Sequence, residues 1–202
     1  MSIPASLVKE LREKTGAGIM DCREALQECQ GDLSNAVIHL RKKGLADAQK
    51  RAGRLTSEGT IGSYIHSNGK IGVLVEVNCE TDFVARTTEF KELVKDLAMQ
   101  VAAANPRYLS SEGIPPEEAE KEKAILRAQA QDTKKPENII GRIVEGRFKK
   151  FIEDTCLLEQ AYVKDPDTTV KQRVEQAILQ LGENIAIRRF VRFQLGEVIE
   201  CT

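Results

Sequence analysis

The chain of 202 residues is 41% hydrophobic and 30% charged, a composition typical of a folded protein with one substantial domain or two small ones. Lys and Arg together number 30 against 31 for Asp and Glu, so the net charge of −1 gives no overall positive field to hold a nucleic acid. Aromatic residues make up only 4% of the chain and tryptophan is absent, which disfavours surfaces that stack on bases or sugars. We therefore expect no direct binding of nucleic acid.

The sequence also lacks the usual signs of a membrane protein, a secreted protein or a metalloenzyme. No stretch is apolar for long enough to cross a bilayer, and the first residues lead directly into an amphipathic pattern, so we expect an intracellular chain without a membrane partner. The odd number of cysteines, without a C-x-x-C pair, argues against a disulfide framework and a zinc site. The cysteines are Cys22, Cys29, Cys79, Cys156 and Cys201. Because the two histidines, His39 and His66, lie far apart in the sequence, we expect no metal and no cofactor.

The first 58 residues have the pattern of a small helical module followed by a linker. Apolar residues recur at helical spacing in three short segments, and glycines separate these segments. We predict a three-helix module over residues 1–44 and an Ala-rich, basic linker helix over residues 45–58. The basic residues of the linker, Lys50, Arg51 and Arg54, either face water or contact a partner.

After the linker, the hydrophobic period changes to two, which is typical of β-strands. Residues 60–66 and 71–77 are predicted strands, joined through Asn68-Gly69 in a type I′ hairpin turn. A third strand is predicted over residues 185–195. One of its faces would carry Ile187, Val191, Phe193 and Leu195, and the other Arg188, Phe190, Arg192 and Gln194. The three strands predict one antiparallel sheet.

The segment between the second and third strands has mainly helical periodicity. Helices are predicted over residues 89–105, from Pro115-Pro116 to residue 131, and from Pro136 onward. After a turn at residues 165–167, Thr168 or Thr169 would cap a last helix that ends at Gly182. We therefore predict the α+β class, in which a three-helix bundle precedes a core over residues 59–202. In this core, helices pack on one face of a three-stranded antiparallel sheet.

Polar turn-forming residues and an aromatic residue crowd the junction that follows the second strand. In one interpretation, Thr81 or Asp82 caps a helix and Phe83 packs into the core. In the other, the loop presents Asp82 and Phe83 to a partner, because loops on a rigid scaffold often carry binding residues. The local pattern does not distinguish these interpretations.

Two long segments of the sequence carry recognisable motifs. They are residues 76–86, Glu-Val-Asn-Cys-Glu-Thr-Asp-Phe-Val-Ala-Arg, and residues 11–26. The first resembles a signature of the elongation factor Ts family, the exchange factors of elongation factor Tu, and the second resembles the family's ubiquitin-associated-like N-terminal module. Residues 145–151 and 182–189 also resemble family segments. Longer members carry two core subdomains, a projecting helical hairpin and a further C-terminal helix, whereas this chain has room for one core and looks like the short form.

The resemblance implies a guanine nucleotide exchange factor that performs no covalent chemistry. It would bind elongation factor Tu, both with GDP and without nucleotide, and disturb the magnesium and phosphate-binding site through Thr81, Asp82, Phe83 and Val84. The N-terminal module would bind through Lys9, Arg12, Ile19 and Met20. His66, which matches a histidine of the family's second subdomain, is either a further contact or an exposed turn residue. Since no G-x-x-x-x-G-K-[ST] loop occurs, we expect the chain not to bind GTP itself.

The short form also predicts an assembly and a cellular setting. One sheet face would lack covering helices, so we hypothesise a homodimer that pairs two such faces. An intersubunit disulfide through Cys201 is disfavoured by a reducing cytosol. The expected location is the bacterial cytoplasm, or the matrix or stroma of an organelle. Two rival functions are an adaptor, whose activity would survive deletion of residues 56–202, and an enzyme, which the two histidines do not support.

Overall fold

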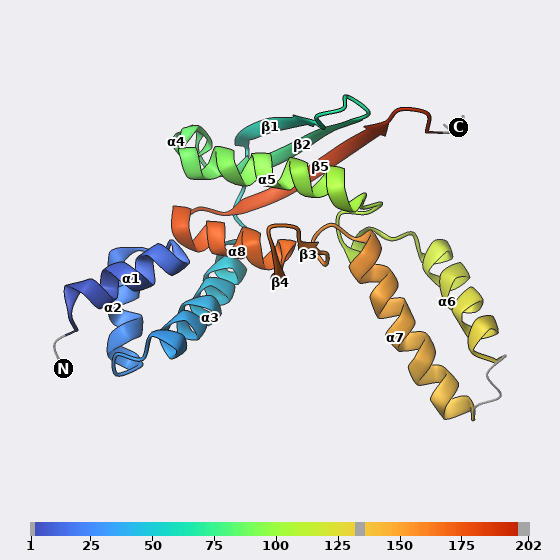
Figure 1. Cartoon of the computed structure of the whole chain (residues 1–202), viewed down its shortest axis with the longest axis horizontal. Helices are drawn as coiled ribbons and strands as arrows, with labels where there is room; N and C mark the ends of the chain where they lie inside the picture. The colour runs from blue at the N-terminus through green and yellow to red at the C-terminus, as the bar shows by residue number, and fades with distance from the viewer. Residues whose placement is uncertain (1–2, 132–135, 198–202) are drawn as a thin grey trace.

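The computed structural model describes residues 3–131 and 136–197 and confirms the predicted α+β class (Figure 1). Helices α1 (Ala5–Thr15), α2 (Ile19–Glu28) and α3 (Leu33–Arg51) form the N-terminal module. Their apolar faces enclose a small core in which Leu11, Leu26 and Leu40 are buried. Asp32 caps α3 by accepting a hydrogen bond from the backbone N–H of Asn35 at 3.0 Å. Cys201 lies outside the described residues.

The predicted third helix and the predicted linker helix are one continuous helix. Helix α3 passes through Gly44 and ends at Arg51, and residues 52–57 lead without helix into the sheet. Gly44 is buried where α3 packs on α8 (Val170–Leu181), and a Cβ atom there would lie 3.5 Å from Cδ2 of Leu179. A helix packed against the core, rather than a flexible tether, therefore holds the N-terminal module.

Strands β1 (Glu58–Ile65), β2 (Ile71–Cys79) and β5 (Ile185–Gln194) form the predicted antiparallel sheet, in the order β1-β2-β5. The hairpin between β1 and β2 is confirmed, but its turn is not of type I′. Gly69 has a φ of 68°, whereas Asn68 does not reach positive φ. Instead, the Asn68 side chain accepts a hydrogen bond from the backbone N–H of Lys70 at 3.0 Å, which stabilises the turn.

The predicted faces of β5 are wrong, because the strand contains a bulge. Its pairing with β2 skips Arg188. Before the bulge, Ile185 and Ile187 are buried against the core, but Val191 and Phe193 after it are exposed on the opposite face. Since side chains alternate along a strand, one extra residue transfers every later side chain to the other face.

Helices cover one face of the sheet and leave the other face open (Figure 1). Helices α5 (Thr88–Ala104) and α8 pack on the covered face, where Val75 and Val77 of β2 meet Phe90 and Leu93 of α5 in a buried core. The open face carries exposed apolar side chains from all three strands: Ile61, Ile65, Leu74, Val191 and Phe193. This set is called the open-face patch below.

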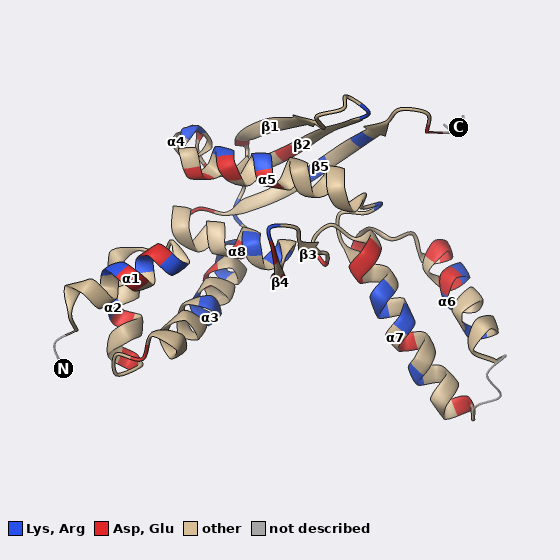
Figure 2. Cartoon of the chain, viewed as in Figure 1, with Lys and Arg blue, Asp and Glu red and all other residues tan. Residues whose placement is uncertain are grey.

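A helical hairpin projects from the core, contrary to the expectation that only longer members carry one. Its helices are α6 (Pro116–Gln131) and α7 (Glu137–Thr155), which pack on each other and extend away from the sheet (Figure 1). Leu126, Ala130 and Ile140 are buried within the hairpin, and charged residues of both signs occur along both of its helices (Figure 2). Among the described residues, no helix combines the length and the apolarity needed to cross a membrane.

Buried polar contacts fix the base of this hairpin to α5. Short strands β3 (Ala161–Tyr162) and β4 (Asp165–Thr169) pair where the sequence predicts a simple turn, and a short helix, η1 (Ser111–Gly113), precedes α6. Gln100, which is 1% exposed, accepts a hydrogen bond from the backbone N–H of Val163 at 2.7 Å. Tyr162 donates to Asp96 Oδ2 at 2.6 Å, and its burial raises the pKa of this phenol. The hairpin thus projects from a fixed point.

The close approach of α5 to β1 gives a test of the fold. A Cβ atom at Gly62 would lie 2.3 Å from Cγ1 of Val94, so we expect Gly62→Ala to lower the free energy of unfolding by about 1–3 kcal/mol. The matched control is Gly146→Ala on α7, where a Cβ atom meets nothing within 4 Å and should stabilise the helix by about 0.5–1 kcal/mol. Urea unfolding measures both, and equal effects would contradict the packing described here.

Candidate functional site

The polar junction after β2 folds into a single helical turn, α4 (Asp82–Arg86). Thr81 is its N-cap, and the Thr81 hydroxyl oxygen accepts a hydrogen bond from the backbone N–H of Val84 at 3.4 Å. Thr87 then caps α5 in the same way, through the backbone N–H of Phe90. Thr81, rather than Asp82, is therefore the helix cap of the two that the sequence allowed.

Helix α4 turns its largest side chain toward the solvent. Phe83 is 78% exposed, whereas Ala85 is 8% exposed and Val84 packs against the main core. The interpretation that Phe83 packs into the core is therefore wrong. Burial of a phenyl ring contributes about 1.5–3 kcal/mol of free energy, and an exposed ring does not contribute this to folding. The same free energy can contribute to binding if a partner buries the ring.

The acidic residue beside this ring is held by a weak and replaceable contact. Asp82 Oδ2 lies 2.7 Å from Nη2 of Arg86, one helical turn away, and the Arg86 side chain is 75% exposed. Such surface ion pairs contribute about 0.2–1 kcal/mol, so a partner can displace Arg86 at little cost. The outer surface of α4 thus offers an apolar ring and a carboxylate that can change partners.

The support of α4 comes from a residue that sequence reasoning did not select. Glu183, in the turn between α8 and β5, accepts hydrogen bonds from the backbone N–H groups of Glu80 and Thr81 at 3.1 and 3.0 Å. The Thr81 hydroxyl donates to the same carboxylate at 2.6 Å. Glu183 belongs to the motif of residues 182–189, which the sequence shows, but the sequence does not show that this motif contacts residues about a hundred positions away.

Cys79 lies at the end of β2, next to these contacts. Burial raises the pKa of the Cys79 thiol to about 11, so this cysteine stays protonated at neutral pH.

The N-terminal module carries a second candidate surface. Lys9, Arg12 and Ile19 line one hollow of about 450 Å³, together with Ile3, Ala5, Val8 and Arg23. Ile19 is 55% exposed, and Met20 beside it is 64% exposed. A lining of apolar and cationic side chains fits an amphipathic helix with acidic residues along its edge. Three of the four residues predicted on this module therefore line one hollow, and the fourth, Met20, is exposed and follows Ile19 in the sequence.

The remaining predicted residue, His66, lies apart from α4. It follows β1 at the end of the hairpin, and its Nδ1 atom lies 3.2 Å from the Tyr64 hydroxyl. The strand register places the opposite end of β1, Glu58, beside Cys79 and the start of α4. With about 3.3 Å per residue, the eight residues of β1 separate His66 from α4 by roughly 25 Å. His66 is exposed, as a turn histidine would be.

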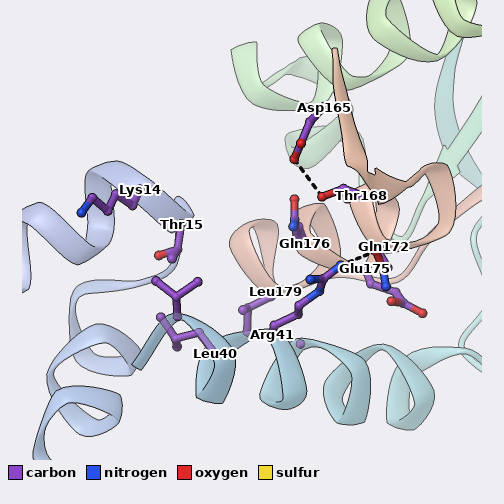
Figure 3. Close-up of a pocket in the computed structure, with 12 residues that line it drawn as sticks. Lys14, Thr15, Leu40, Arg41, Asp165, Thr168, Gln172, Glu175, Gln176 and Leu179 are labelled. Carbon is purple, nitrogen blue, oxygen red and sulfur yellow. Dashed lines mark hydrogen bonds between the residues drawn. The ribbon is translucent and has the colours of Figure 1, made fainter. Parts of the chain in front are cut away.

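A crevice of about 260 Å³ marks the seam between the N-terminal module and the core (Figure 3). It is lined by residues of α1, α3, β4 and α8, including Thr15, Leu40 and Leu179. Arg41 of α3 donates a hydrogen bond to Gln172 of α8 across this seam, and burial raises the pKa of Glu175. Direct contacts beside this crevice join the N-terminal module to the core. None of the predicted site residues lines the crevice.

Comparisons with known proteins place these features in a family. Residues 48–197 match the model of the family described as Elongation factor TS. Elongation factor Ts of Thermoanaerobacter sp. (strain X514) is 60% identical over 198 residues, which cover 98% of this chain and 97% of that protein. Elongation factor Ts of Geobacter sulfurreducens is 59% identical over 200 residues, which cover 99% of this chain and 93% of that protein. These relatives match nearly the whole chain.

The exposure of Phe83 predicts a ring that contributes little to folding. We expect Phe83→Ala to change the free energy of unfolding by less than about 0.5 kcal/mol, since Phe83 is mostly exposed to solvent. The control is Phe90→Ala in the next helix, where the fully buried ring should cost about 3–5 kcal/mol. Thermal unfolding of both variants checks this contrast, and a strongly destabilised Phe83→Ala protein would argue against an outward-facing ring.

Proposed function

Because the chain belongs to the elongation factor Ts family and is therefore a translation elongation factor, we propose that it binds elongation factor Tu and accelerates the release of GDP. The observation that carries this proposal is the outward position of Phe83, 78% exposed on a capped helical turn that the core supports. The chain forms and breaks no covalent bond in this role. It changes the relative stability of two states of its partner.

In the proposed mechanism, α4 acts on the G domain of elongation factor Tu. Phe83 enters an apolar crevice of that domain, and Asp82 leaves Arg86 to accept hydrogen bonds from the partner. Thr81 and Val84 hold the turn that carries them. The insertion displaces the elements that bind the magnesium ion and the phosphates of GDP. Nucleotide affinity falls because the partner cannot keep both sets of contacts.

Energy magnitudes require a second contact besides α4. Accelerating release about ten-thousandfold needs roughly 5.5 kcal/mol of differential binding between the nucleotide-bound and empty partner. One buried phenyl ring supplies about 1.5–3 kcal/mol of this. We assign the remainder to an interface on the order of 1,600 Å² that includes Lys9, Arg12, Ile19 and Met20 on the N-terminal module. By thermodynamic reciprocity, GDP weakens the binding of this chain by the same factor.

We further propose that the chain acts as a homodimer in the bacterial cytoplasm. The open-face patch supports the dimer, because Leu74 lies directly opposite Val191 in the sheet and Phe193 is 63% exposed two residues further along β5. A contiguous apolar surface of this kind is a common site of association, and a two-fold axis would let two patches cover each other. The bacterial relatives support the location.

The exchange reaction provides the direct test. Purified elongation factor Tu loaded with fluorescent GDP should release it far faster with this chain than without it, in a stopped-flow measurement. We expect Phe83→Ala to lower the maximal stimulated rate by about tenfold to a hundredfold, as the loss of one buried ring implies. Unchanged release by Phe83→Ala would refute the role of α4. If the chain keeps its full binding activity after deletion of residues 56–202, the result would favour an adaptor built on the N-terminal module.

The dimer has its own test in solution. We expect light scattering at micromolar concentration to give the mass of two chains, and Phe193→Glu to give the mass of one chain because it places a charge in the paired faces. The control is Leu55→Glu, since Leu55 is 83% exposed but lies before β1 and outside the open-face patch. A wild-type mass of one chain would rule out the dimer.

A further inference from the structure

Two turns from distant parts of the chain bind each other beneath α4. The first turn, Glu80-Thr81, leads from β2 into α4, and the second, Glu183-Asn184, leads from α8 into β5. Glu183 accepts three hydrogen bonds from the first turn, at 3.1 Å from Glu80 N, 3.0 Å from Thr81 N and 2.6 Å from the Thr81 hydroxyl. We call this pair of turns the carboxylate clasp.

The clasp is reciprocal, since the first turn also binds the second. Glu80 Oε1 accepts a hydrogen bond from the backbone N–H of Asn184 at 2.6 Å and lies 3.4 Å from Nη1 of Arg54. These contacts lower the pKa of the Glu80 carboxyl, the Asn184 bond most of all. Asn184, 6% exposed, donates from its side chain to the Arg54 carbonyl at 3.0 Å. The chain before β1 is thereby joined to both turns.

Helix α4 needs such support because it is too short to fix its own direction. A helix of five residues is below the length at which helical hydrogen bonds offset the cost of nucleation. The pairing of β2 with its neighbours ends at Cys79, so the sheet offers no partners to the N–H groups of Glu80 and Thr81. By accepting a hydrogen bond from the Thr81 hydroxyl, Glu183 also leaves a lone pair of that oxygen directed at the N–H of Val84. One carboxylate thus orients both the turn and the helix cap.

We propose that Glu183 is a positioning residue for nucleotide exchange, which holds α4 rigid while Phe83 is pushed into the partner. This inference rests on the function proposed above, in which α4 strains the G domain. Force on the ring is balanced by force on the base of α4, so a loose base would let α4 yield in place of the partner. Loss of the clasp therefore lowers the maximal rate of GDP release more than the affinity for elongation factor Tu.

Two substitutions separate the reach of the side chain from its charge. Glu183→Asp keeps the charge but withdraws the oxygens by one methylene, whereas Glu183→Gln keeps the length and can still accept from both N–H groups. We expect Glu183→Asp to lower the maximal stimulated rate by about tenfold, the effect of roughly one charge-assisted hydrogen bond, and to change the half-saturating concentration by less than about twofold. Glu183→Gln should stay within about threefold of the wild-type rate.

A double substitution and a matched control test whether Glu183 acts through the ring. In a Phe83→Ala background, Glu183→Asp should lower the maximal rate of GDP release almost no further, because α4 then carries no ring for Glu183 to hold in position. The control is Glu118→Asp at the base of the projecting hairpin, where a carboxylate likewise accepts hydrogen bonds from two residues, Arg107 and Tyr108. This control should leave exchange unchanged. Additive losses, or an equal loss in the control, would overturn the inference.

Hydrogen exchange of the free chain gives a readout that does not depend on elongation factor Tu. The amides of Glu80 and Thr81 should exchange about tenfold faster in Glu183→Asp than in the wild type, at equal global stability. If this variant does not fold, Thr81→Val removes the hydroxyl contact to Glu183 together with the cap on Val84, keeps both backbone contacts to Glu183, and should also slow release. If amide exchange is faster in Glu183→Asp but the rate of GDP release is unchanged, only this inference is overturned. If the wild-type chain does not accelerate GDP release, the proposed function is overturned.

Discussion

The packing of α5 on one face of a three-stranded sheet is the constraint on which the rest of the molecule depends. Gly62 lets α5 approach β1, and Phe90 and Leu93 fill the space above β2. A sheet this small has one helical layer and one buried face. All other parts extend from the ends of this layer: α4 precedes α5, the projecting hairpin follows it, and α3 packs on α8. The layer thus fixes where each exposed surface lies.

The sequence predicted the elements whose signals are local. The strands β1 and β2, the helix α5 and the last helix all follow from hydrophobic period. Of the two predicted caps of the last helix, Thr169 is the one observed, and it forms a capping box with Gln172. Gly44 was misleading, because glycine commonly follows a helix but here allows two helices to touch. The bulge at Arg188 could not be predicted, since alternation gives no sign of where a pairing partner is skipped. Local rules therefore predicted elements better than faces.

The candidate site divides in the same way. Residue preference limits the helix cap to Thr81 or Asp82, but the direction of Phe83 depends on which side of α4 meets the core. Ala85 and Val84 occupy that side, so the ring faces the solvent. Glu183 reaches the site only because the fold brings the turn after α8 beside the turn after β2. Contacts between residues about a hundred positions apart depend on the topology of the whole fold, so they cannot be predicted from a short motif.

An exchange factor must bind its partner firmly and still be displaced by nucleotide, and the proposed function divides these two needs between the N-terminal module and α4. In the proposed function, the hollow beside Arg12 binds the partner away from the nucleotide, whereas α4 carries the contact that competes with the nucleotide. Because α3 runs unbroken from the module to its contact with α8, binding at the hollow brings α4 to a defined position. In the proposed mechanism, returning nucleotide has to overcome the strained contact at Phe83 together with the part of the interface that favours the empty partner. In this proposal, expulsion of the ring weakens the remaining interface, and the partner then dissociates.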